Sequence, residues 1–124
     1  MSTILIVEDN EKNMKLARDV LQAKGYTTLE AVTAEEGLRV AKEQKPDLVL
    51  MDIQLPGISG IEAFGQLRAD PRTAAIPVVA LTASVTPTDR TQITEAGFDA
   101  FVGKPINLKE FLETVKRLVE SGRP

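Results

Sequence analysis

The chain has 124 residues, with 15 Lys and Arg against 18 Asp and Glu, a net charge of −3, and no Cys or His. This length suits one domain, and the two missing residue types exclude disulfides, thiolate and imidazole catalysis, and the usual transition-metal sites. The acidity argues against nucleic-acid binding, and without a long apolar run or a basic leader we expect a cytoplasmic protein that does not insert into membranes.

Short apolar or β-rich runs alternate along the chain with segments of helical spacing. The runs are Thr3–Val7, Thr27–Val32, Asp47–Met51, Pro77–Leu81 and Ala100–Val102. The helical stripes between and after them are carried by Met14, Ala17 and Leu21; Ala34, Leu38 and Ala41; Ile61, Phe64 and Leu67; and Leu108, Phe111, Leu112, Val115, Leu118 and Val119. The segment before Gly97 is the weakest helix, because Ile93 and Ala96 are almost its only apolar residues.

Residues that favour helix ends stand where the helical spacing begins or stops. Gly25 suits the position after the first helix. Pairs typical of a helix start precede three other helices, namely Thr33 with Glu36, Thr86 with Pro87, and Asn107 with Glu110. We therefore predict one domain over residues 1–120, a short tail at 121–124, and no output domain.

The alternation predicts an α/β fold in which a doubly wound parallel sheet of five strands carries helices on both faces. Three runs contain continuously apolar stretches, as central strands buried on both faces do, namely Ile4–Val7, Leu48–Met51 and Val78–Leu81. Thr27–Val32 alternates between apolar and polar residues, which places it at an edge. The pattern favours a (βα)5, flavodoxin-like strand order of 2-1-3-4-5, with the switch point between the first and third strands.

Ligands of open parallel sheets bind beyond the carboxyl ends of the strands. Glu8 and Asp9 follow the first strand, Asp52 the third, Thr82 the fourth and Lys104 the fifth. Carboxylates held this close repel unless a cation joins them, and without His or Cys a hard ion such as Mg²⁺, or alternatively Mn²⁺, is the natural choice. A carboxylate beside such an ion can attack a phosphoryl group, whose oxygens the Lys and Thr side chains are suited to bind.

Four motifs along the chain carry a resemblance to a known family: Ile4–Asn10, Leu50–Gly57, Ala80–Ala83 and Lys104-Pro105. They resemble the receiver domains of two-component response regulators, the CheY-like family, and Asn13–Leu16 adds a likeness to stand-alone single-domain members. The resemblance implies a bacterial phosphorelay switch that turns over no metabolite. Its partners would be a sensor histidine kinase or phosphotransfer protein and a downstream protein effector.

The resemblance also assigns roles to the residues at the strand ends. Asp52 would be the phosphoacceptor and Lys104 would pair with the phosphoryl group. Asp9 would ligate Mg²⁺ directly and Glu8 largely through water, with the backbone carbonyl of Gln54 as a further ligand. Because the chain contains no His, the phosphoryl donor must come from another protein.

Signalling would depend on a switch pair, Thr82 and Phe101, although Phe101 is also simply explained as a core aromatic. Phosphorylation would change the face formed by the fourth helix, fifth strand and fifth helix, because a weakly packed helix shifts at low cost. The resemblance further implies that Gln54 and Ser84 tune dephosphorylation and that the bond before Pro105 is cis.

Two other functions compete with the switch. A haloacid-dehalogenase-like phosphatase also uses an Asp nucleophile, Mg²⁺, Thr or Ser, and Lys, but it carries a second Asp where this chain has Gln54. A degenerate receiver would act only as a docking module. The complete set of acidic, hydroxyl and amino groups argues against that second alternative.

Overall fold

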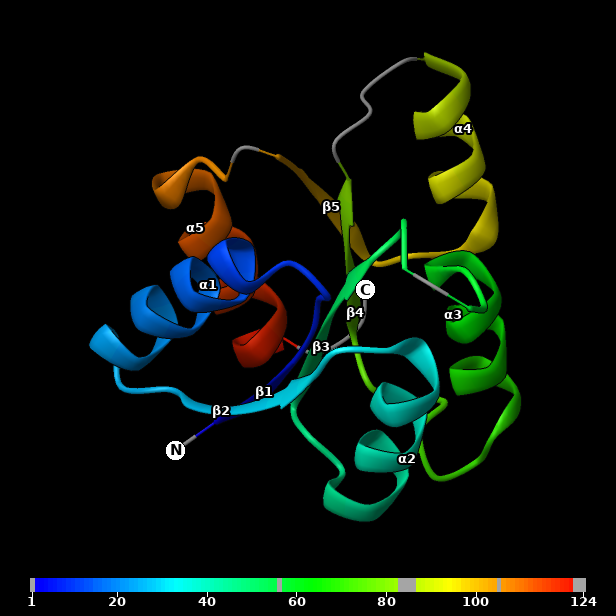
Figure 1. Ribbon diagram of the computed structural model, residues 1–124, viewed down its shortest axis with the longest axis horizontal. Coiled ribbons are helices and arrows are strands. Elements are labelled where there is room, and N and C mark those ends of the chain that lie inside the picture. Colours follow the sequence, from blue (N-terminus) through cyan, green and yellow to red (C-terminus); the bar gives the residue numbers. More distant parts are fainter. Residues whose placement is uncertain (1, 56, 83–86, 105, 122–124) are drawn as a thin grey trace.

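The computed structural model describes residues 2–55, 57–82, 87–104 and 106–121, and strands and helices alternate throughout them (Figure 1). The order is β1 (Thr3–Val7), α1 (Glu11–Ala23), β2 (Thr27–Ala31), α2 (Ala34–Gln44), β3 (Leu48–Asp52), α3 (Gly60–Ala69), β4 (Val78–Thr82), α4 (Pro87–Ala96), β5 (Ala100–Gly103) and α5 (Leu108–Ser121). The predicted alternation is therefore confirmed.

The sheet is five-stranded and parallel in every pairing, with the order β2-β1-β3-β4-β5. This confirms the predicted order and the switch point between β1 and β3. The continuously apolar runs form the central strands, and β3 and β4 are buried at every residue. The alternating strand β2 lies at one edge and the short β5 at the other, where partly exposed residues are tolerated.

Helices cover both faces of the sheet, with α1 and α5 on one side and α2, α3 and α4 on the other (Figure 1). Strand β1 contributes side chains to the core on both faces of the sheet, because successive side chains of a strand point to opposite faces. Ile4 and Ile6 belong to the same core cluster as Phe111 of α5, whereas Leu5 and Val7 belong to the cluster that contains Phe64 of α3. No helix among the described residues is both long and apolar enough to cross a membrane.

The predicted helix ends are largely confirmed. Thr33 Oγ1 accepts a hydrogen bond from Glu36 N, and Asn107 Oδ1 accepts one from Glu110 N. Gly25 follows the cap of α1 with φ +91°, a left-handed value that favours glycine. Asn10 caps α1, because its side chain accepts hydrogen bonds from Lys12 N and Asn13 N. Glu8 and Asp9 are thus left outside the helix.

Strand boundaries differ from the predicted ones by one residue at several ends. Asp52 and Thr82 are the last residues of β3 and β4 rather than the first residues beyond them. The reason is that the hydrogen-bonded ladder continues past them, with Ile53 N donating to Leu81 O and Lys104 N to Thr82 O. The side chains therefore project from rigid strand ends.

Some predictions fall partly or wholly outside the described residues. These are the Thr86 cap, the tuning position Ser84, the cis bond at Pro105 and most of the tail. Of the predicted tail, Ser121 belongs instead to α5, which continues to that residue. The helix therefore runs one residue beyond the predicted domain end.

Gly60 allows α3 to begin against the end of β3. A Cβ at this position would overlap the carbonyl oxygen of Asp52 and lie 2.8 Å from Ile53 Cα. Gly65, in the same helix, has nothing within 4 Å of the corresponding position. Substitutions at the two glycines therefore distinguish the effect of the close contact at Gly60 from the general entropic cost of glycine in a helix.

We expect Gly60→Ala to lower the free energy of unfolding by about 1–3 kcal/mol, because the added methyl displaces backbone at the strand end. The matched Gly65→Ala variant should instead raise it by about 0.5–1 kcal/mol, since alanine loses less entropy in a helix. Urea unfolding measures both values. Equal effects of the two substitutions would contradict the packing argument.

Candidate acidic site at the carboxyl edge of the sheet

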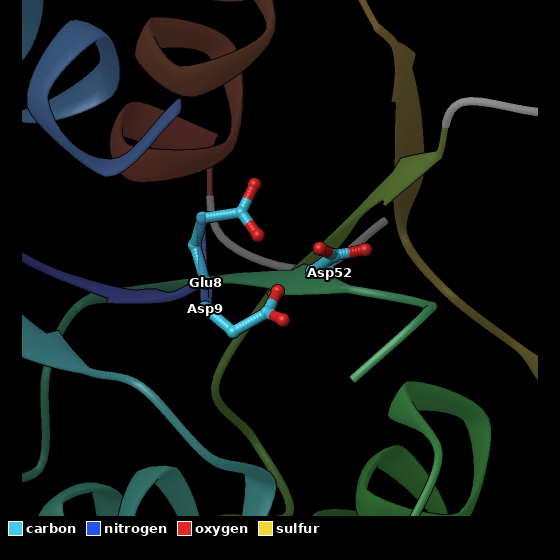
Figure 2. Close-up of side chains that lie close together, drawn as sticks. All are labelled: Glu8, Asp9 and Asp52. Carbon is cyan, nitrogen blue, oxygen red and sulfur yellow. The ribbon is translucent and has the colours of Figure 1, made fainter. Parts of the chain in front are cut away.

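The predicted site residues converge at the carboxyl edge of the sheet. One carboxylate oxygen from each of Glu8, Asp9 and Asp52 lies within 4.8 Å of the other two. Figure 2 shows the three carboxyl groups facing a common space, two from the β1–α1 connection and one from the end of β3. Glu8 and Asp52 are buried, with 1% and 4% of their surface exposed, whereas Asp9 is exposed.

Both carboxylate oxygens of Asp52 have partners within the protein. Its Oδ1 accepts a hydrogen bond from Gln54 N at 2.9 Å, and its Oδ2 accepts one from Lys104 Nζ at 2.8 Å. The first bond folds the chain after β3 back toward the strand end, and the second reaches across from β5. The carboxylate is thereby fixed in position before any ligand arrives.

Lys104 links two of the three acidic groups. Its Nζ lies 2.7 Å from Glu8 Oε1 and 2.8 Å from Asp52 Oδ2, and its side chain is 14% exposed. One cation thus faces two buried carboxyl groups, with the third close by. The excess of acidic groups at the site is the property that a bound cation would balance.

The proton distribution follows from this shortage of positive charge. Burial raises the pKa of Glu8 to about 7, helped by its hydrogen bond with Asp52 and opposed by Lys104. Burial also acts to raise the pKa of Asp52, but the bonds from Glu8, Lys104 and Gln54 N outweigh it and lower that pKa. The pKa of Lys104 is raised, because its bonds to Asp52 and Glu8 outweigh the effect of burial. Near neutral pH the site therefore holds an ionised Asp52, a protonated Lys104 and a partly protonated Glu8.

This donor set fits a hard divalent cation. All the side-chain ligands are carboxylate oxygens, which Mg²⁺ and Mn²⁺ prefer. The proton retained by Glu8 marks a position where positive charge is favourable. The exposure of Asp9 leaves one side of the cluster open to solvent, as an ion that keeps bound water requires.

The proposed switch residues share one face of the sheet. Thr82 pairs with Gly103, and Ala80 pairs with Phe101, so the Thr82 and Phe101 side chains point to the same side of adjacent strands. Val78 is two further residues back on β4 and belongs to the core beneath α3, which identifies this side as the one carrying α3 and α4. Thr82 is buried and Phe101 is half-buried.

Sequence reasoning missed a second charged cluster, at the opposite end of β4 and β5. Arg68 on α3 forms an ion pair with Asp99 at 2.7 Å and donates to Ile76 O at 2.8 Å. The guanidinium carbon lies 4.6 Å from the centroid of the Phe64 ring, which stacks on Phe98. Contacts across so many residues leave no periodic signal. The N-terminal cap of α3, Ser59, was also not predicted, although a Ser three residues before Glu62 is a local signal that could have found it.

A parallel five-stranded sheet that brings an acidic trio, a threonine and a lysine to its carboxyl edge defines a receiver domain. Residues 4–116 match the family model described as the response regulator receiver domain. The chain belongs to this family, and hence to the proteins of two-component signalling.

The relatives narrow the class further. The chain is 46% identical over 114 residues to the polar-differentiation response regulators DivK of Brucella anthropi and Brucella ovis. The match covers 92% of this chain and 93% of each relative. The predicted likeness to single-domain receivers, of which DivK is the type, is confirmed at this level.

Solved structures agree with the fold. A putative response regulator from Chloroflexus aurantiacus has a TM-score of 0.91 at 30% identity, covering 96% of this chain and 98% of that one. The receiver domain of a sensor histidine kinase from Pseudomonas aeruginosa has a TM-score of 0.90 at 31% identity, covering 97% and 98%. That second structure has a magnesium ion coordinated in its active-site cleft.

The raised pKa of Glu8 makes the stability of the metal-free protein depend on pH. Between the ordinary value of 4.5 and about 7, the folded state binds a proton that the unfolded chain does not. Stability is therefore expected to fall as pH rises through this window, and Glu8→Gln should flatten the profile. The chain has no His to titrate in the same range.

Urea unfolding in the presence of a chelator, at several pH values from about 5 to about 8, measures this dependence. A cation that replaces the proton should bind more tightly at the upper end of the range, which calorimetry with MgCl₂ measures. Stability that rises between these pH values in the wild type, with the same slope in Glu8→Gln, would contradict the assignment.

Proposed function

We propose that this receiver accepts a phosphoryl group on Asp52 from the phosphohistidine of a sensor histidine kinase or a phosphotransfer protein. The observation that carries the proposal is the state of Asp52, which is ionised, fixed by two hydrogen bonds and held beside Lys104. A carboxylate in this state is a prepared nucleophile, and its surroundings are suited to the added negative charge.

In the transfer, a lone pair on an Asp52 carboxylate oxygen forms the new P–O bond. The P–N bond of the donor breaks and its electron pair returns to the imidazole nitrogen. Lys104 carries its proton throughout, because its pKa is raised by the acidic groups around it. Its ammonium group is therefore available to pair with the phosphoryl oxygens, and the Thr82 hydroxyl is available to hydrogen-bond to them.

The same cluster is the proposed magnesium site. Asp9 and Asp52 would hold the ion directly and Glu8 largely through water, with the Gln54 carbonyl as a backbone ligand. When bound, Mg²⁺ supplies positive charge to the oxygens of the transferred group. The carboxylate-only donor set and the cation-deficient charge balance support this assignment.

The output is a changed surface on α4, β5 and α5 that a protein effector binds. Thr82 and Phe101 share the face of the sheet that α4 covers, so a movement of Thr82 toward the phosphoryl group would be accompanied by inward rotation of Phe101. Among the side chains described in α4, only Ile93 is buried. A helix anchored this lightly can move without disrupting the core.

We place this activity in the bacterial cytoplasm and expect no turnover of a metabolite. A phosphatase of the haloacid-dehalogenase type is the weaker reading, because the acid–base position two residues after Asp52 is Gln54, whose exposed amide does not exchange protons in the required way. A pure docking module would not require an Asp52 that is ionised and fixed by two hydrogen bonds, so this alternative is also the weaker one. Gln54 and Ser84 are the proposed determinants of phosphoryl lifetime.

Incubation with Mg²⁺ and acetyl phosphate or phosphoramidate should add one labile phosphoryl group, which intact-protein mass spectrometry detects. Asp52→Asn removes the nucleophile and should abolish the adduct, whereas Asp19→Asn, at an exposed carboxylate of α1, should leave it unchanged. Lys104→Met should slow the reaction by about 100-fold or more, since it removes the cation facing the phosphoryl oxygens.

The outcomes separate the three readings. Continuous release of phosphate from general phosphate esters would favour the phosphatase. Failure of the folded wild type to form any adduct with either donor would contradict the switch and favour the docking module.

The second expected effect is a directional structural response. Adding beryllofluoride and Mg²⁺, as a phosphoryl mimic, should shift the amide NMR signals of α4 and β5 while those of α2 stay in place, because the switch pair lies on the face of the sheet that α4 covers. Asp52→Asn should remove the response. Unchanged signals for residues 87–103 in the wild type, with the mimic bound, would contradict the proposed output face.

A further inference from the structure

Helix α5 has a buried apolar face and, on the opposite side, an exposed charged face. Phe111, Val115 and Leu118 bury the inner face in the core. The opposite side bears Lys109, Glu113, Lys116 and Glu120, all exposed. Their spacings of four, three and four residues keep them on one stripe of the helix. We call these four residues the α5 stripe.

The α5 stripe borders a surface hollow of about 430 Å³. Tyr26, from the connection between α1 and β2, and Leu112 supply its apolar lining, and both are partly buried against the core. Lys24 adds a cation at the same connection. The hollow lies on the side of the sheet that α1 and α5 cover (Figure 1).

The α5 stripe differs from comparable charge pairs on the other helices. On α1, Lys15 pairs with Asp19 at 2.5 Å, and on α2, Arg39 pairs with Glu43 at 3.1 Å, each four residues apart. The stripe contains two pairs with the same spacing and the same order of charges. Its four side chains nevertheless form no ion pair with any residue that the structure describes.

The charge order of the stripe is self-complementary. Read along the helix it is plus, minus, plus, minus, and it is symmetric in position about the midpoint between Thr114 and Val115. A two-fold axis through this midpoint places an antiparallel copy of the helix opposite the first. Lys109 then faces Glu120 of the second copy and Glu113 faces Lys116, and each contact occurs twice.

We propose that the α5 stripe and the adjoining hollow form a self-association surface, occupied by α5 of a second copy of this chain in antiparallel orientation. Each of the four charges gains an opposite partner in this register. Helix α5 of the second copy also covers the apolar lining from Tyr26 and Leu112, which removes this lining from water. The association does not need the acidic site, because none of these residues belongs to it.

The pattern favours a second copy over a purely acidic partner. An acidic segment would match the lysines but would place like charges against Glu113 and Glu120. A parallel copy would place lysine on lysine in the same way. Because each chain carries a net charge of −3, general electrostatics oppose association, and attraction must come from a locally complementary surface such as this one.

Analytical ultracentrifugation of the full chain, from about 10 μM to about 1 mM and at low and high NaCl, tests the proposal. The wild type should form a dimer that high salt weakens. The acidic-stripe variant Lys109→Glu/Lys116→Glu and the basic-stripe variant Glu113→Lys/Glu120→Lys should each be monomeric, with dissociation constants raised at least about tenfold. An equimolar mixture of the two should recover a one-to-one dimer.

Circular dichroism should show that both variants fold, since the substituted positions are exposed. Arg39→Glu, which makes one comparable charge reversal on the other face of the sheet, is the control and should leave the dimer intact. A wild type that stays monomeric throughout, or a dimer that survives in both stripe variants, would overturn the proposal. So would a monomer whose α5 amide signals shift with polyglutamate, because the surface would then suit an acidic partner.

Discussion

The central feature of the structure is a site that holds more carboxyl groups than positive charges. Lys104 faces Glu8 and Asp52 at 2.7 and 2.8 Å, and Asp9 brings a third carboxylate to the same place. Buried carboxylates without enough cations are costly, so the pKa of Glu8 rises to about 7 while the pKa of Asp52 is lowered. In our proposal a bound cation offsets this cost and a phosphoryl group is attached to Asp52. The rest of the fold holds the three carboxyl groups and Lys104 in place.

The helices on the two faces of the sheet differ in how firmly they are packed. On one face α1 and α5 pack through large buried side chains such as Leu21 and Phe111, and they leave a charged outer surface suited to lasting contact. On the other face α4 rests lightly beside α3 and shares its side of the sheet with Thr82 and Phe101. The Arg68–Asp99 ion pair fixes the far end of β5, so that movement is expected at the end nearer Asp52.

Much of this could be predicted from the sequence, because it follows from local pattern and from topology. The continuous apolar run at Leu48–Met51 predicts a central strand, and parallel pairing then brings Asp52 beside the residues after β1 and beside the end of β4. What could not be predicted depends on depth and on long-range contact. The pKa of Glu8 depends on its nearly complete burial, and the Arg68–Asp99 pair joins residues 31 positions apart. No spacing rule encodes either one.

The central claim is that Asp52 is the residue that carries the phosphoryl group. Borohydride reduction of the phosphorylated protein cleaves an acyl phosphate and converts the modified aspartate to homoserine, which peptide mass spectrometry locates. The account predicts homoserine at position 52 alone, and only when Mg²⁺ was present during phosphorylation. Homoserine at another aspartate, or a stable phosphoryl group that borohydride does not remove, would contradict it.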